Sequence, residues 1–472
     1  MKKRIGLIAL LLCMISQYRL AQAYDVLQGQ GTTSLVTRMQ AQRVVLRKFP
    51  WPYQAMLAID SDADHTDLRK FNEVHEFLNT FDETPMGKGL GLDVSDSFFL
   101  YNGSNLSLPI DVGGKTVKNE MTMFQGTSKQ LSVYAPILLH YIRHGWIDTY
   151  HSAGDFSRWN THTTLFRRSL EVQAMYFLKE QHIPAILDFT DHGNQSNVAN
   201  FGSYDHFDRY MQGDNPSSPY YIADLVQQEG VKFLWADNYD NQYVYSSMLY
   251  PIRLRNGTKI WGFHRFTGTR TFWHKKREKE VVWREEWTPY KLAVELSDSR
   301  LQQLIQAQGY TIVATHLEGN ADKMPLPTTA IEALTHLAHL QDEGKILVAR
   351  TSRLLWYNLV QQGLTYRVLS GTHHPITYID VTGVNDPVDG NFVPTWQELR
   401  GITWFVPHPN HATIIINGQL IPNNAIVRTK GTIGIAWYPS STINWAVSLH
   451  TPEYQQLKQQ MLQNEKNQPR SL

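Results

Sequence analysis

The chain has almost no cysteine: Cys13 is the single one among 472 residues. It lies in an N-terminal stretch that we expect to be removed, so the mature protein would have no disulfide, no thiol nucleophile and no cysteine-ligated zinc. Charge is also scarce, at 18% of residues, and balanced, with 44 Lys+Arg against 43 Asp+Glu. That balance argues against a protein that coats nucleic acid. No later run is apolar enough for a membrane helix, and a hydrophobic share of 42% suits a globular chain with a large core.

The N-terminus has the pattern of a secretory signal peptide. Three basic residues at 2–4 precede an apolar run at 5–15 that is too short to span a bilayer. Ala21-Gln22-Ala23 has the A-x-A form of a cleavage site, so we expect residues 1–23 to be removed and the chain to start at Tyr24. The expected location is therefore periplasmic or secreted, with no stable membrane insertion after cleavage.

Short apolar segments alternate with helical patterns between residues 51 and 362. This alternation predicts an α/β domain with a parallel sheet, either open or closed into a barrel. Two stretches, 88–126 and 241–295, interrupt this alternation and are expected to be insertions. Residues 88–126 are expected to form loops with short strands. The expected strands are 53–59, 146–150, 185–189, 231–235, 311–315 and 346–349, and the expected helices are 68–80, 129–143, 163–181, 223–229, 301–308 and 328–341.

The pattern changes after residue 362. β-rich segments separated by turn signals such as Asn417-Gly418 predict a small all-β, sandwich-like domain over 363–450. Residues 24–50 are expected to form an N-terminal arm, and 451–472 a polar tail on the surface.

Polar side chains follow five of the predicted strands. In a parallel sheet or barrel, the carboxyl ends of the strands meet at one edge, where active sites are built. These residues are Asp60 and Asp62 after the first strand, His151 after the second, Asp191 and His192 after the third, Asp237 after the fourth and His316 after the fifth. We predict a site that contains them, with Asp191, His192 and Asp237 in contact with substrate.

The spacing of two of these side chains suggests a metal site. His151 and Asp155 are four positions apart and would share one face of a helical turn. With Asp62 as a third ligand, imidazole and carboxylates suit zinc, iron, cobalt or nickel, and we expect zinc. Asp60 would then be the general base and His316 the general acid.

The segment Asp60-Ser61-Asp62-Ala63-Asp64 has a second interpretation. D-x-D-x-D opens the calcium loop of EF-hands, but His65 stands where that loop needs glycine and Phe71 where it needs glutamate. We therefore reject an EF-hand and leave open a structural calcium site of another kind. Asp64 and Asp67 can also cap the helix that follows.

From about residue 51 to residue 360, the chain resembles the polysaccharide deacetylase family, the NodB-homology carbohydrate esterases. The resemblance rests on a strand ending in Asp60-Ser61-Asp62, on His151-Ser152-Ala153-Gly154-Asp155 in place of H-S/T-x-x-H, and on Ala314-Thr315-His316 in place of Leu-x-His. It implies an irregular parallel (β/α) barrel, a divalent metal, and hydrolysis of N- or O-acetyl groups on a carbohydrate. It also implies a base at Asp60, a metal ligand at Asp62 and an acid at His316.

The chain departs from the family pattern at two points. Asp155 replaces the second metal histidine, and no R-P motif supplies the family's base-orienting arginine. We therefore expect a divergent, metal-dependent deacetylase. The alternatives are a glycosidase that uses Asp60 and Asp62, and a non-catalytic glycan-binding protein.

Overall fold

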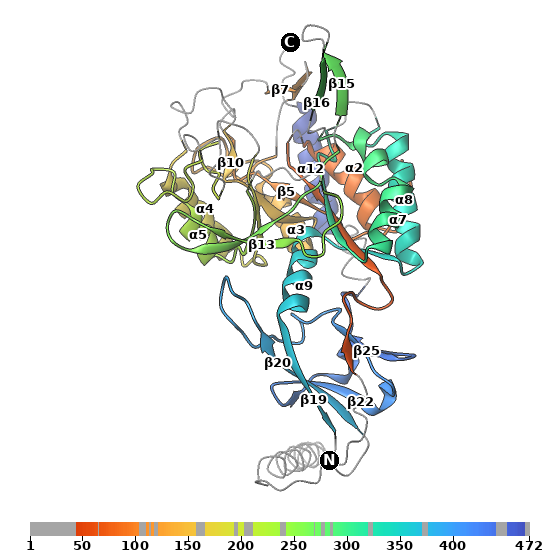
Figure 1. Ribbon diagram of the computed structural model, residues 1–472. Helices are drawn as coiled ribbons and strands as arrows, with labels where there is room; N and C mark the ends of the chain where they lie inside the picture. The colour runs from red at the N-terminus through yellow and green to blue at the C-terminus, as the bar shows by residue number, and fades with distance from the viewer. Residues whose placement is uncertain are drawn as a thin grey trace, which may run out of the picture. The chain divides into compact units, whose positions relative to one another are not determined.

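A curled, mostly parallel β-sheet forms the centre of the protein in the computed structural model (Figure 1). The structure describes residues 44–64, 66–102, 110–112, 115–117, 121–156, 166–192, 197–202, 211–236, 242–268, 270–274, 279–283, 287–319, 324–370, 376–439 and 451–467. All of them belong to one compact unit that begins at Val44. The predicted signal peptide, residues 1–23, lies outside the described residues.

The central sheet has nine described strands, and eight of them run in one line of hydrogen-bonded neighbours. Every adjacent pair is parallel except β13 and β14. In spatial order they are β13 (Leu249–Arg253), β14 (Lys259–Phe263), β12 (Phe233–Trp235), β11 (Asp188–Thr190), β9 (Ile147–His151), β5 (Ser95–Phe98), β2 (Ala55–Ser61) and β17 (Tyr310–Thr315), while β18 (Ile346–Val348) pairs with β2.

Backbone bridges link the two ends of this sheet. Tyr245, before β13, pairs with Tyr310 of β17, and Phe266, after β14, pairs with Val313. The Phe266 amide donates to Ile312 O at 2.8 Å, and the Ala314 amide donates to Phe266 O at 2.8 Å. The sheet with its helices thus forms at least a half-barrel, which is compatible with the predicted α/β barrel.

The helices that lie between the strands in the sequence pack against the sheet (Figure 1). Asp67 caps the first of them, because its side chain accepts the Lys70 amide at 2.9 Å. Gly145 ends another in the left-handed conformation, with φ of 79°. The helices are α2 (Leu68–Asn79), α3 (Ala135–His144), α4 (Arg168–Glu180), α5 (Ala223–Gln228), α6 (Leu292–Glu295), α7 (Asp298–Gln306), α8 (Thr328–Asp342), α9 (Thr351–Gly363) and α12 (Pro452–Asn467), with 3-10 turns at Pro289–Lys291, Pro409–His411 and Asn423–Ala425.

Strand β2 shows how alternation places the functional side chains. Successive side chains of a strand point to opposite faces. Met56 and Ala58 pack with Phe233 and Tyr310 inside the curl, whereas the alternate residues of β2 pack with buried side chains of α2 and α8. Asp60 therefore points inward, toward the strand ends where the site lies.

The six predicted strands and the six predicted helices all have a counterpart, with ends shifted by a few residues. The stretches predicted as insertions nevertheless supply three strands of the central sheet, β5, β13 and β14. β5 was missed because its sequence is polar: Ser95 Oγ donates to Asp148 Oδ1 at 2.5 Å, which satisfies both groups inside the protein. Helix α9 was also not expected.

Two further four-stranded sheets are built from strands that follow α9, together with β1 from the start of the described chain, in the orders β1-β21-β25-β24 and β19-β20-β22-β23. Their buried side chains belong to the same apolar cluster as the inner face of the central sheet. Their strands are β1 (Val45–Leu46), β19 (Leu364–Ser370), β20 (Thr377–Val384), β21 (Thr403–Phe405), β22 (Ala412–Ile416), β23 (Gln419–Leu420), β24 (Ile426–Thr429) and β25 (Thr432–Ile435). A separate sandwich-like domain stays a prediction.

Short ribbons complete the described chain. They are β3 (Glu83–Thr84) with β4 (Gly87–Lys88), β7 (Ile110–Val112) with β8 (Lys115–Val117), β15 (Arg270–His274) with β16 (Lys279–Trp283), and β6 (Tyr101–Asn102) parallel to β10 (Gly154–Asp155). Within the described ranges, no helix combines the length and the apolar character needed to cross a membrane.

Candidate metal centre

Hydrogen bonds of the parallel ladder continue past the strand ends and hold the loops in place. The Asp62 amide donates to Thr315 O at 2.9 Å, and the Ser152 amide donates to Thr190 O at 2.7 Å. The loop after β2 is therefore held beside the end of β17, and the loop after β9 beside the end of β11. Five side chains from these loops and strand ends meet there: Asp62, Asp64, His151, His192 and His316.

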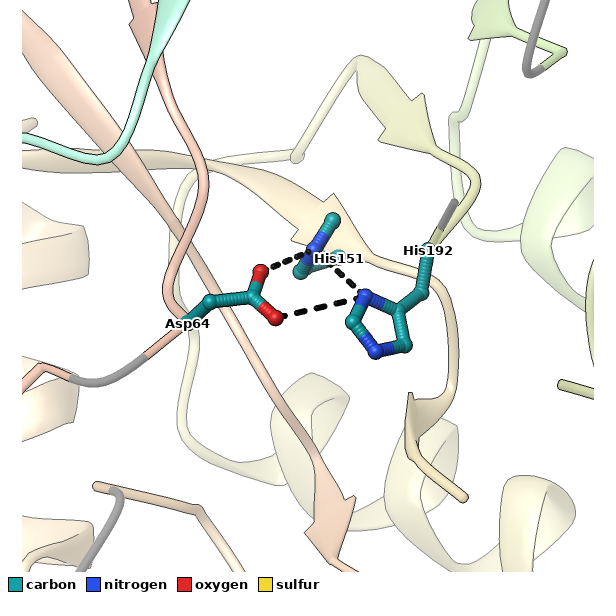
Figure 2. Close-up of side chains that lie close together, drawn as sticks. All are labelled: Asp64, His151 and His192. Carbon is teal, nitrogen blue, oxygen red and sulfur yellow. Dashed lines mark hydrogen bonds and ion pairs between the residues drawn. The ribbon is translucent and has the colours of Figure 1, made fainter. Parts of the chain in front are cut away.

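Asp64, His151 and His192 form the closest group (Figure 2). Nε2 of His151 lies 2.9 Å from Oδ2 of Asp64 and 3.1 Å from Nδ1 of His192. Nδ1 of His192 lies 3.6 Å from Oδ1 of Asp64. All three side chains are buried.

These three side chains fit a divalent metal ion. Ligands about 2.0–2.1 Å from a tetrahedral zinc ion lie roughly 3.3–3.4 Å from one another. The two imidazole nitrogens lie 3.1 Å apart, and the carboxylate of Asp64 lies 2.9 Å from one of them through Oδ2 and 3.6 Å from the other through Oδ1, which is close to that spacing. Two imidazole nitrogens and one carboxylate oxygen are also a donor set that zinc accepts. The buried group can hold a metal ion, and its donor set alone does not determine which one.

Asp155 lies on the far side of His192 from this group. Its Oδ1 is 3.2 Å from Nε2 of His192, whereas Nδ1 of that ring faces Asp64. The helical turn expected from His151 to Asp155 does not form, because Ser152 has φ of 51° and Gly154 has φ of 154°. A Cβ at Gly154 would lie 2.1 Å from Tyr101 O, so the chain turns where only glycine fits.

Arg265, after β14, binds both carboxylates at the end of β2. Its Nε lies 3.1 Å from Oδ2 of Asp60, and its Nη2 donates to Oδ2 of Asp62 at 2.8 Å. The guanidinium also lies over the rings of Trp235 and Trp287, at 4.3 and 5.1 Å from their centroids. Its side chain is 1% exposed, so the contacts with the two carboxylates are shielded from solvent.

Burial and charge shift two carboxyl pKa values in opposite directions. Burial raises the pKa of Asp60 to about 6, against the opposing charge of Arg265. Burial also acts to raise the pKa of Asp64, but the imidazoles of His192 and His316 and the hydrogen bond with His151 hold it well below its usual range. Asp64 is thus suited to remain a carboxylate ligand, and Asp60 to exchange a proton near neutral pH.

His316 is the most exposed of the group, with 18% of its side chain accessible. Its ring stacks on Trp287, with centroids 5.8 Å apart. Nε2 lies 3.8 Å from Oδ2 of Asp62 and 3.6 Å from Oδ2 of Asp64. Asp62, Asp64 and His316 therefore make a second group that can hold a metal ion, and it shares Asp64 with the first.

The predicted substrate contacts have different surroundings. Asp191 is buried, and its Oδ1 accepts the Phe201 amide at 3.1 Å. The backbone of His192 is held at both ends by Asn200, whose Oδ1 accepts the His192 amide and whose Nδ2 donates to His192 O. Asp237 lies outside the described residues. Substrate contact by these three residues stays a prediction.

The sequence interpretation had not assigned Asp64 and Arg265 to the site. The repeated aspartates after β2 were the one signal for Asp64, because a D-x-D-x-D segment supplies a third carboxylate to the same loop. Arg265 falls in a stretch expected to be an insertion and gives no comparable signal. Neither the protein-family models nor the curated proteins compared with this chain include a match to it.

Proposed function

We propose that this chain is an exported, metal-dependent hydrolase that removes acetyl groups from a carbohydrate, as a divergent relative of the polysaccharide deacetylases. The observation that carries the proposal is the buried Asp64–His151–His192 group next to the Asp60–Arg265 pair. Both lie at the carboxyl ends of parallel strands, where α/β enzymes place their chemistry. On this proposal the curled sheet is the irregular barrel of that family, with a sandwich-like domain after it.

Asp64, His151 and His192 would hold the divalent metal, which we take to be zinc. When bound, such an ion acts as a Lewis acid on a carbonyl and makes water more acidic. Asp155 would position His192 by accepting the proton of its Nε2, the arrangement that fixes the orientation of many metal-ligating histidines. Asp62 would be held away from the metal by Arg265.

Asp60 would be the general base that accepts a proton from the attacking water. Its pKa of about 6 leaves it ionised at neutral pH and able to take up a proton during the reaction. Arg265 contacts Asp60 from the side of Trp235 and keeps the carboxylate charged in a buried position. This arginine would perform the base-orienting role for which the sequence showed no motif.

His316 would donate a proton to the leaving amine or alcohol. Its ring is partly exposed and stacked on Trp287, while the metal ligands are more deeply buried. An imidazole can be protonated near neutral pH and can therefore act as an acid when the acyl bond breaks. Trp287 beside it presents an aromatic side chain that a sugar ring can contact.

The glycosidase alternative is less consistent with the geometry. A glycosidase needs two carboxyl groups that flank the scissile bond. Here one guanidinium contacts both Asp60 and Asp62, so the two carboxylates are held on the same arginine. They cannot enclose a glycosidic bond while that contact persists.

The test is acetate release by the purified full chain from a panel of N-acetylated and O-acetylated glycans. We expect acetate from at least one glycan, loss of activity after chelation, and recovery with added zinc. Asp60→Asn is the matched control, since it should keep the metal and lose about 10²–10⁴-fold in rate. New reducing ends without acetate would indicate a glycosidase, and glycan binding without either product would indicate a binding protein.

A further inference from the structure

A separate buried group of side chains that can ligate a metal lies outside the site described above. It consists of His75 from α2, Asp96 from β5 and Glu318 from the loop after β17. None of the three side chains is more than 1% exposed. One nitrogen or oxygen from each lies within 4.8 Å of the others.

Hydrogen bonds determine which nitrogen of His75 faces this group. Nδ2 of Asn79 donates to Leu92 O at 3.0 Å and to Val94 O at 2.7 Å, so Oδ1 of Asn79 is the atom that faces His75. That oxygen lies 2.9 Å from Nδ1 of His75, which must therefore carry the proton. In the neutral ring, Nε2 then presents a lone pair toward Asp96 Oδ2, 3.4 Å away.

The carboxylates also present acceptor atoms. Oδ1 of Asp96 accepts the Ser97 amide, and Oε2 of Glu318 accepts from Thr66 Oγ1 at 3.4 Å. Glu318 Oε1 is buried, and no described donor group hydrogen-bonds to it, while the carboxyl of Asp96 lies within hydrogen-bond reach of the Glu318 carboxyl. Lys70 donates to the backbone oxygen of Glu318 rather than to its carboxylate. When both acids are ionised, the three side chains therefore present acceptor atoms to one another.

A divalent cation satisfies this arrangement. Two carboxylates carry two negative charges, so one divalent ion would leave the buried group neutral, which is the condition for stable burial of charge. The Nδ1–H donated to Asn79 is the outer contact that metal-ligating histidines make.

We propose that His75, Asp96 and Glu318 form a second, structural zinc site that ties α2 and β5 to the loop carrying His316. Its ligands are almost completely buried, as suits an ion that stabilises the fold and does not meet substrate. Because no ligand is open to solvent, the ion would enter while the chain folds. The site is independent of the proposed hydrolase activity.

The test is the zinc content of full-length protein refolded from denaturant with zinc and passed over a desalting column. We expect two ions per chain in the wild type. Asp64→Ala/His151→Ala should keep one ion, and adding His75→Gln to that variant should remove it. His140→Gln, which changes a histidine of α3 outside both groups, is the matched control and should keep both ions.

A thermal measurement covers the case in which the triple variant does not fold. Asp64→Ala/His151→Ala refolded with zinc should have a higher melting temperature than the same variant refolded without it. A wild type that binds one ion, with none in Asp64→Ala/His151→Ala, would overturn the second site and leave the first intact. An Asp96→Asn/Glu318→Gln variant that is as stable as the wild type in the presence of zinc would also overturn the second site. That result would mean that the two acids are protonated in the folded protein and hold no cation.

Discussion

Arg265 and Asp60 form a buried ion pair in which Nε of the arginine lies 3.1 Å from Oδ2 of the carboxylate. The pair joins the segment after β14 to the end of β2, two parts of the chain far apart in sequence. Burial raises the pKa of Asp60 to about 6 even with this cation present. The pair thus fixes the position of Asp60, and the charge of Arg265 limits the rise in pKa that burial causes.

Replacement of Arg265 should shift the pH dependence of catalysis. The base must be ionised, so activity should rise as pH increases through the pKa of Asp60, at about 6 in the wild type. Without the guanidinium the pKa should rise further, and in Arg265→Gln the rising limb of kcat/KM should move up by about 1–3 pH units. Arg265→Lys keeps the charge and should shift less. An unchanged limb in Arg265→Gln would contradict the role assigned to this pair.

Asp155 should support metal binding without being a ligand. Its carboxylate contacts Nε2 of His192, the nitrogen that faces away from Asp64. We expect Asp155→Asn to weaken zinc affinity by about 10–100-fold, the usual effect of losing such an outer contact. Asp64→Ala should abolish zinc binding at this centre. Competition with a chromophoric chelator measures the zinc affinity of both variants. If Asp155→Asn abolished zinc binding and Asp64→Ala only weakened it, Asp155 would be the ligand.

His316 should be required for turnover and not for metal binding. We expect His316→Gln to keep zinc and to lose about 10²–10⁴-fold in kcat, together with the descending limb of the pH–rate profile. His336→Gln, a substitution of a partly exposed histidine on α8, should leave the rate unchanged. If His316→Gln loses its metal, the group of Asp62, Asp64 and His316 is the metal centre instead.

Glu171 should make stability depend on pH. This residue of α4 is fully buried, neither carboxylate oxygen has a hydrogen-bond partner among the described residues, and burial raises its pKa from 4.5 to about 8. The folded state then binds a proton that the unfolded state has lost, so its contribution is complete below pH 4.5 and is lost as pH rises toward 8.

Glu171→Gln should therefore be more stable than the wild type at pH 8, by on the order of a few kcal/mol, and should gain much less at pH 4.5. Chemical unfolding at the two pH values measures the difference. Glu180→Gln, at an exposed position of the same helix, is the matched control. Equal effects of the two substitutions at pH 8 would contradict the burial argument.

Much of the site could be predicted from strand periodicity, since His151, His192 and His316 lie where the predicted strands end. The position of Asp155 could not be predicted, because it depends on the backbone turn at Ser152 and Gly154 and not on a four-residue spacing.

Arg265 could not be predicted either. The strand that precedes this arginine, β14, is not flanked by a βα pattern in the sequence, and only the curl of the sheet brings Arg265 to Asp60.

The most direct test is anomalous diffraction at the zinc edge from crystals of the zinc-loaded protein. The account predicts a strong peak between Oδ of Asp64, Nε2 of His151 and Nδ1 of His192, with Asp62 still bound to Arg265. A peak centred on Asp62 and Asp155, or no peak near Asp64 at full zinc loading, would contradict it.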